Sequence, residues 1–133
     1  MRSKNIMLLG LTVILLLPLF TKAENCPTPS DLQTGKYANW ILLDINDASS
    51  LSDERIDYFQ THVKSFALAE WEESAPEGAA HCYYYGSDED FTYLGAYLAK
   101  SDLKAAAKEA WKTINEDVMQ CRSDLRSCLF ERT

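Results

Sequence analysis

Histidines are the side chains of this sequence best suited to general acid–base chemistry near neutral pH. The 133 residues contain two of them, His62 and His81. Catalysis by a histidine base requires a nucleophile held close to it, and neither histidine lies in a motif that supplies one. His62 lies beside an apolar stripe, where a histidine more often packs than binds a ligand. We therefore predict that the chain is not an enzyme and has no catalytic residues.

Carboxylates form two clusters, which could in principle bind a metal ion. One consists of Glu70, Glu72 and Glu73, and the other is Asp88-Glu89-Asp90. The first flanks a predicted turn and the second forms one, so solvated loop charge accounts for both. The second cluster also lacks the Asp-x-Asp-x-Asp-Gly frame and the distal glutamate of a calcium loop. The sequence has no Cys-x-x-Cys pair either, and we expect no metal and no cofactor.

The amino-terminal residues have the pattern of a secretory signal peptide. Two basic residues precede the apolar run 6–20, and Thr21-Lys22-Ala23 has small residues at the two positions that a signal peptidase reads. The apolar run is shorter than the roughly 20 residues that span a bilayer. We expect residues 1–23 to be removed and residues 24–133 to form a single domain in the periplasm, without stable membrane insertion. Secretion from the cell is the alternative.

All four cysteines lie in the predicted mature segment: Cys26, Cys82, Cys121 and Cys128. An even number of cysteines in an exported chain indicates disulfides, here two. Four cysteines allow three pairings. We favour Cys26–Cys82 as a long-range link and Cys121–Cys128 as a local one.

The net charge restricts the classes of binding partner. The chain carries 13 basic and 20 acidic residues, and three of the basic residues lie in the predicted signal peptide. The mature protein would therefore have 10 basic residues against 20 acidic ones, a net charge of −10. Nucleic acids and anionic lipids bind basic surfaces, so both are excluded as expected partners. The charge suits a soluble protein or one that binds a basic partner.

The run His81-Cys82-Tyr83-Tyr84-Tyr85 is the central element of the predicted sheet. Tyrosine favours strands, and successive strand side chains point to opposite faces. Cys82 and Tyr84 should then point toward a core, and His81, Tyr83 and Tyr85 toward the other face.

Periodicity and turn residues predict the remaining elements. We expect strands at 37–45, 66–72, 80–85, 91–98 and 118–121. We expect helices at 51–64 and 101–111, the second because it is rich in alanine and begins with a capping serine. Residues 26–32 are predicted to be an extended lead-in. The expected fold class is α+β, a small antiparallel sheet (a meander) with one or two packed helices and two disulfides.

One aromatic set could form an interface. We predict that the candidate interface residues share one sheet face: His81, Tyr83, Tyr85, Tyr93 and Tyr97. Rows of tyrosine recur at protein interfaces because the ring offers area at a low entropic cost. The alternative is that a helix covers this face and the tyrosines only pack. A homo-oligomer would also use such a face.

Several short motifs along the chain resemble those of a known group of proteins. They are Cys26-Pro27, Cys82-Tyr83-Tyr84, Trp111, Cys121 and Cys128-Leu129-Phe130. The pattern resembles that of small periplasmic proteins of intracellular gamma-proteobacteria, which begin Cys-Pro after the signal, carry a central Cys-x-Tyr and end in Cys-x-Phe. It is similar to the EirA-type intracellular-replication proteins associated with type IV secretion. The resemblance implies a non-enzymatic accessory role in an envelope assembly and assigns no site residues.

Two functions are therefore expected. The first is binding of protein partners in the cell envelope, in support of a type IV secretion system or another assembly. The alternative is inhibition of a basic enzyme such as lysozyme, which an acidic exported protein would suit.

Overall fold

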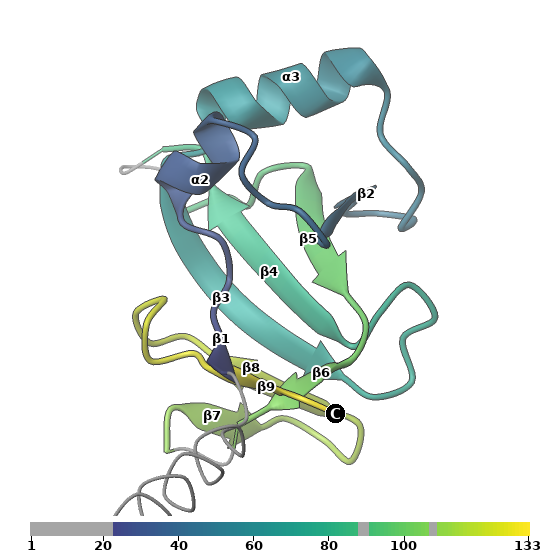
Figure 1. The fold of residues 1–133 in the computed structure, drawn as a ribbon, viewed down its shortest axis with the longest axis vertical. Coiled ribbons are helices and arrows are strands. Elements are labelled where there is room, and N and C mark those ends of the chain that lie inside the picture. Colours follow the sequence, from purple (N-terminus) through teal and green to yellow (C-terminus); the bar gives the residue numbers. More distant parts are fainter. Residues whose placement is uncertain (1–22, 88–90, 107–108) are drawn as a thin grey trace, which may run out of the picture.

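The computed structural model describes residues 23–87, 91–106 and 109–133. Within these ranges the helices are α2 (Pro29–Gln33) and α3 (Asp53–His62) (Figure 1). The strands are β1 (Ala23–Glu24), β2 (Ile41–Asp44), β3 (Ser65–Glu72), β4 (Ala80–Tyr85), β5 (Ala96–Lys100), β6 (Leu103–Ala105), β7 (Trp111–Thr113), β8 (Val118–Cys121) and β9 (Phe130–Arg132). None of the helices in these ranges is long and apolar enough to cross a bilayer.

The strands form two antiparallel sheets. The larger sheet has the order β2-β5-β4-β3-β8-β7, and the smaller one has the order β1-β9-β6. Consecutive strands β3, β4 and β5 are neighbours, which is the predicted meander, and β2 and β8 pair at its two sides. The fold class is α+β, as expected from the sequence.

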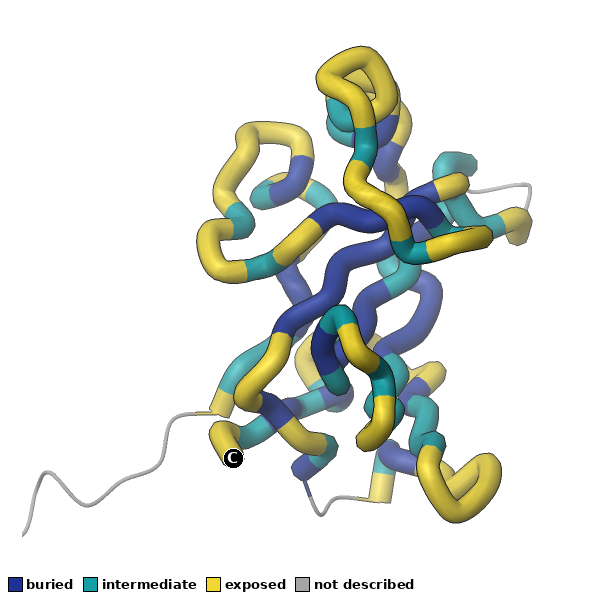
Figure 2. Tube along the Cα trace, turned by 90° about the vertical axis from the view of Figure 1, so that its right-hand side faces the viewer, coloured by how far each residue is buried: buried dark blue, intermediate teal, exposed yellow. Residues whose placement is uncertain are grey.

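The two faces of β4 have different environments. Cys82 and Tyr84 have no exposed surface and belong to the main core. The buried residues of both helices, Leu32 of α2 and Phe59 of α3, lie in the same core, and Phe59 meets Tyr84 edge to face at 6.1 Å between ring centroids. In Figure 2 the buried segments run through the middle of the molecule, and the exposed loops lie around them. Both helices therefore bury residues on the disulfide side of β4.

Helix α3 begins where the sequence predicts. The Ser52 hydroxyl accepts a hydrogen bond from the Arg55 amide at 3.3 Å, and two acidic residues occupy the first turn. Both features stabilise a helix amino terminus. The helix ends at His62, close to the predicted end.

The predicted extended lead-in is wrong, because α2 lies within it. The Thr28 hydroxyl accepts from the Asp31 amide at 3.0 Å, and Pro29 occupies the first helical position. Proline is well suited to that position because its fixed φ is helical and its missing N–H would have no partner there. The two prolines suggested extended chain, but one of them opens a helix.

The predicted alanine-rich helix at 101–111 is also wrong. The segment instead contains β6, which pairs with β9, and leads to β7, which pairs with β8. Leu103 and Trp111 are buried, whereas Ile114, just after β7, is 55% exposed. Helix propensity is worth well under about 1 kcal/mol per residue, so strand pairing and burial override it.

Two predicted strands are displaced. The strand expected at 37–45 is limited to β2, and the one expected at 91–98 is replaced by β5, which begins five residues later and ends at Lys100. Tyr93 precedes β5 and joins the sheet only through an isolated bridge to Tyr85. The predictions at 66–72, 80–85 and 118–121 are confirmed by β3, β4 and β8.

The disulfides join Cys26 to Cys82 and Cys121 to Cys128, the pairing favoured from the sequence. All four cysteines are buried. Three predictions involve residues outside the described ranges: the signal peptide before Ala23, the acidic turn Asp88-Glu89-Asp90, and positions 107–108 of the expected helix.

Candidate functional site

The predicted interface residues come together as a stacked aromatic cluster. We call His81, Tyr83, Tyr85, Tyr93 and Tyr97 the tyrosine ladder. Tyr83 stacks on Tyr97 with ring centroids 5.2 Å apart and lies 5.8 Å from Tyr93, which in turn stacks on Tyr85 at 5.5 Å. His81 packs edge to face on Tyr97 at 5.1 Å. The ladder therefore runs through all five residues.

The ladder is buried at one end and open at the other. His81 and Tyr97 are 2% and 5% exposed, whereas Tyr83, Tyr85 and Tyr93 are half-buried. At the buried end, Tyr97 packs with Leu43 of β2 and with the half-buried loop residues Ile45 and Ala48. The ladder thus shows a gradient of burial from His81 to Tyr93.

Phe91 extends the open end of the ladder and was not among the predicted site residues. Its ring meets Tyr85 edge to face at 5.5 Å, and the residue is 74% exposed. Phe91 precedes Tyr93 by two residues, and residues at this spacing in a strand share one face, so the sequence could have identified it. The Tyr93 hydroxyl accepts a hydrogen bond from the Arg122 guanidinium at 3.2 Å, so a cation borders this end.

Carboxylates border the buried end. The Tyr83 hydroxyl donates to Glu70 at 3.4 Å, and the Tyr97 hydroxyl donates to Glu77 at 3.2 Å. Burial, and secondarily these negative charges, raise the pKa of both phenols well above the ordinary value of 10.0. Both hydroxyls therefore remain neutral donors.

His81 is fixed by its contacts on both ring nitrogens. Nε2 donates to the carbonyl oxygen of Gly78 at 2.7 Å, with Glu77 3.4 Å away, and Nδ1 faces Oε1 of Glu70 at 3.4 Å. Gly78 has a φ of 134°, and a Cβ there would lie 2.8 Å from the backbone of Lys100. Only glycine fits, so this turn presents its carbonyl to His81 in a defined position.

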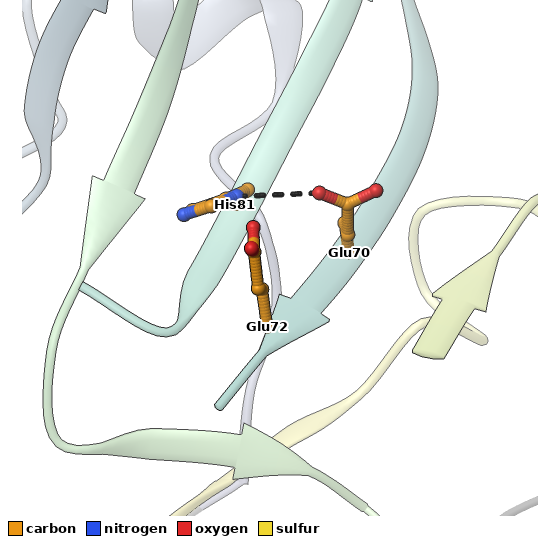
Figure 3. A group of neighbouring side chains, drawn as sticks. All are labelled: Glu70, Glu72 and His81. Carbon is orange, nitrogen blue, oxygen red and sulfur yellow. Dashed lines mark hydrogen bonds and ion pairs between the residues drawn. The ribbon is translucent and has the colours of Figure 1, made fainter. Parts of the chain in front are cut away.

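Glu70 and Glu72 lie on β3 beside His81 (Figure 3). Their carboxylate oxygens and a ring nitrogen of His81 are all within 4.8 Å of one another. Hydrogen bonding from His81, opposed by burial and assisted by Gln120, holds the pKa of Glu70 below its usual value of 4.5. Hydrogen bonds donated to a carboxylate favour its ionised form.

The prediction that these glutamates are solvated loop charge is wrong for Glu70 and Glu72. Both are half-buried strand residues, while Glu73 is exposed. Glu70 and Glu72 alternate with Trp71, so they share the face opposite to its side chain. The hairpin register then sets Glu70 directly across from His81. Assigning a strand register to the predicted hairpin would have placed Glu70 opposite His81 and so identified this cluster.

His62, the other histidine, lies apart from the ladder on α3. Its ring stacks on Tyr58 at 3.9 Å, and Nδ1 donates to the Tyr58 carbonyl at 2.8 Å. Both residues line a groove between α3 and Leu94–Ala96. Arg55, which also lines the groove, forms an ion pair with Asp44.

No protein-family model, curated protein or solved structure matches the chain.

Proposed function

We propose that this chain is a non-enzymatic, exported binding protein that holds a protein partner on the open end of the tyrosine ladder. The proposed location is the periplasm, after removal of a signal peptide near Ala23. The two disulfides support export, because such bonds persist in oxidising compartments. The resemblance to periplasmic proteins of intracellular gamma-proteobacteria supports a role in a type IV secretion or other envelope assembly.

The observation that carries this proposal is the exposure of Phe91 over the stacked rings of Tyr85 and Tyr93. Phe91 is 74% exposed and is held by a neighbouring ring rather than by the core. Aromatic residues are enriched at protein interfaces and dominate their binding energy. Stacking also fixes the rotamers in advance, so less side-chain entropy is lost on binding.

Charge indicates the chemistry of the partner. The predicted mature chain has a net charge of −10, and Glu70, Glu72 and Glu77 border the same sheet face. A partner surface with an apolar pocket for Phe91 at the open end and basic residues facing the carboxylates of the buried end would be complementary. We therefore propose a basic protein surface of the cell envelope as the partner.

The test is capture of envelope proteins by the tagged chain, followed by identification of the bound proteins. The variant Phe91→Ala/Tyr85→Ala should reduce capture at least tenfold. The matched control is Tyr58→Ala, because Tyr58 is also an exposed aromatic residue, 58% exposed, but lies on α3. Equal loss in both variants, or none in either, would refute a partner site on the ladder.

A second copy of the chain is the competing occupant of this face. Light scattering coupled to size-exclusion chromatography gives the mass of the purified protein at several concentrations. A dimer that dissociates in Phe91→Ala/Tyr85→Ala would assign the ladder to self-association. A monomer at all concentrations would leave the face free for the envelope partner.

The acidic border favours a second candidate function, inhibition of a basic enzyme such as lysozyme. Opposite net charges accelerate and stabilise such complexes. The assay is clearing of a turbid cell-wall suspension by lysozyme, with and without the purified protein. Unchanged clearing at a several-fold molar excess would eliminate this candidate, and the envelope-capture experiment would be unaffected.

A further inference from the structure

The β3–β4 hairpin brings one imidazole and two carboxylates to a single point at the buried end of the ladder. Figure 3 shows the three side chains converging, with His81 on β4 and both glutamates on β3. We propose that Glu70, Glu72 and His81 form a binding site for one divalent transition-metal ion of the zinc class. The site shares Glu70 and Glu72 with the acidic border of the ladder, but the inference does not rest on the proposed partner, whose contact is Phe91 at the open end.

The orientation of His81 is that of a metal ligand. The residue is 2% exposed, and its Nε2–H donates to the Gly78 carbonyl at 2.7 Å. Metal-binding histidines characteristically donate their second ring N–H to a carbonyl or carboxylate, which fixes the ring and directs the other nitrogen at the ion. Here that other nitrogen is Nδ1, and its recorded neighbour among the described residues is Oε1 of Glu70.

The separation of these two atoms, long for a hydrogen bond, also suits two ligands of one ion. Nδ1 and Oε1 are 3.4 Å apart, beyond the usual range of about 2.7–3.2 Å for a good hydrogen bond. Two ligands of a tetrahedral ion with bonds of about 2.0–2.1 Å lie about 3.3 Å apart. Gln120 donates to Oε2 of Glu70 at 2.8 Å, so the carboxylate is held with Oε1 directed at the histidine.

Glu72 completes a set of three ligands. Its carboxylate lies with the other two donor atoms inside a 4.8 Å limit, a span that one ion can bridge with only small side-chain adjustments. Glu72 is half-buried, and its backbone N–H donates to the Ala79 carbonyl at 2.8 Å, whereas its carboxylate has no hydrogen bond among the described residues. One nitrogen and two oxygens leave a fourth position for water from the solvent side.

Because Nε2–H is donated to the Gly78 carbonyl, Nδ1 is free to offer its lone pair on the side of Glu70. A metal ion placed between Nδ1 and the two carboxylates would supply the positive charge that these donor atoms favour. Glu77, Tyr83 and Tyr97 are the other ionisable groups around the ring.

The ligand types select the ion. Imidazole nitrogen favours zinc, copper, nickel and iron, whereas magnesium and calcium favour sites made of oxygen alone. Zinc also accepts three protein ligands and one water. The proposed site departs from the expectation that the chain binds no metal. In that expectation Glu70 and Glu72 were interpreted as solvated loop charge.

The test is a calorimetric titration of chelator-treated, full-length mature protein with Zn²⁺. One ion should bind per chain. Glu72→Gln should weaken binding at least tenfold, while Glu73→Gln, an exposed carboxylate on the same segment, and His62→Gln should leave it unchanged. Mg²⁺ should not compete.

A second measurement is independent of any variant. The chain has two histidines, so their ring ¹⁵N resonances are readily separated. Zn²⁺ should shift the Nδ1 resonance of His81 and leave Nε2 protonated. The proposal is overturned if Nδ1 of His81 does not respond to Zn²⁺, or if Glu72→Gln binds the ion as tightly as the unchanged protein.

Discussion

The hydroxyl of Tyr84 donates to the carbonyl oxygen of Pro27 at 2.5 Å, across 57 residues of sequence. Tyr84 has no exposed surface, and burial raises its pKa well above the ordinary value. The contact lies two residues from Cys82, whose disulfide partner is Cys26. A covalent bond and a buried hydrogen bond therefore attach the amino-terminal segment to β4 at adjacent points.

Removal of this hydroxyl should destabilise the fold. In Tyr84→Phe the buried Pro27 carbonyl loses its donor, and an unsatisfied buried group costs about 1–3 kcal/mol. Urea unfolding followed by far-ultraviolet circular dichroism gives the change in free energy of unfolding. Tyr58→Phe, at an exposed position, is the control and should stay within about 0.5 kcal/mol of the unchanged protein. Equal stability of the two variants would contradict the assigned role.

The two disulfides should differ in their contribution. Their cysteines are separated by 56 and 7 residues, which corresponds to about 4 and about 2.5 kcal/mol in the chain-entropy model. Cys26→Ala/Cys82→Ala should therefore unfold at lower urea than Cys121→Ala/Cys128→Ala. All four cysteines are buried, so the packing loss is comparable in both. The reverse order would show that native-state effects outweigh loop closure.

Two substitutions in and near the alanine-rich segment can test whether it forms strands or a helix. Leu103→Ala removes a side chain that is 1% exposed and should cost about 2–5 kcal/mol. Ile114→Ala changes a residue that is 55% exposed and should cost little. A helix would have put both residues on one buried stripe and made both substitutions costly. Thermal or urea unfolding of the two variants distinguishes these arrangements.

Stability should fall at acidic pH through Glu70. Its folded-state pKa lies below 4.5, so the folded protein holds this proton less tightly than the unfolded chain does. The stabilisation is complete above about pH 4.5 and is lost as the pH falls through the folded-state value. Urea midpoints between pH 3 and 7, measured in chelator, should decline less steeply for Glu70→Gln than for the unchanged protein. Glu73→Gln should keep the original profile.

Local patterns predicted the centre of the fold well. The tyrosine run forms β4, and α3 begins at the Ser52 cap with two acidic residues in its first turn. Both were predicted because strand preference and helix capping depend only on neighbouring residues. The α2 helix was missed although Thr28 and Pro29 form a recognisable start, since two prolines also indicate extended chain. The Ser101–Trp111 prediction failed because weak alanine preferences were weighed without knowledge of β8 and β9, the strands that pair with this part of the chain.

The site was predicted in part for the same reason. The alternation of strand side chains gathered His81, Tyr83 and Tyr85 on one face, as expected. Phe91 was left out of the set, and the gradient of burial along the ladder depends on loops whose paths the sequence does not specify.

The sequence by itself determined the two faces of β4 and the number of disulfides, because side-chain alternation and cysteine count are properties of the chain itself. The tertiary structure decided that Glu70 lies opposite His81, since a shift of one residue in the hairpin register would have moved both glutamates to the other face. It also decided that an alanine-rich segment forms strands, because pairing partners distant in sequence supply hydrogen bonds that outweigh local propensity.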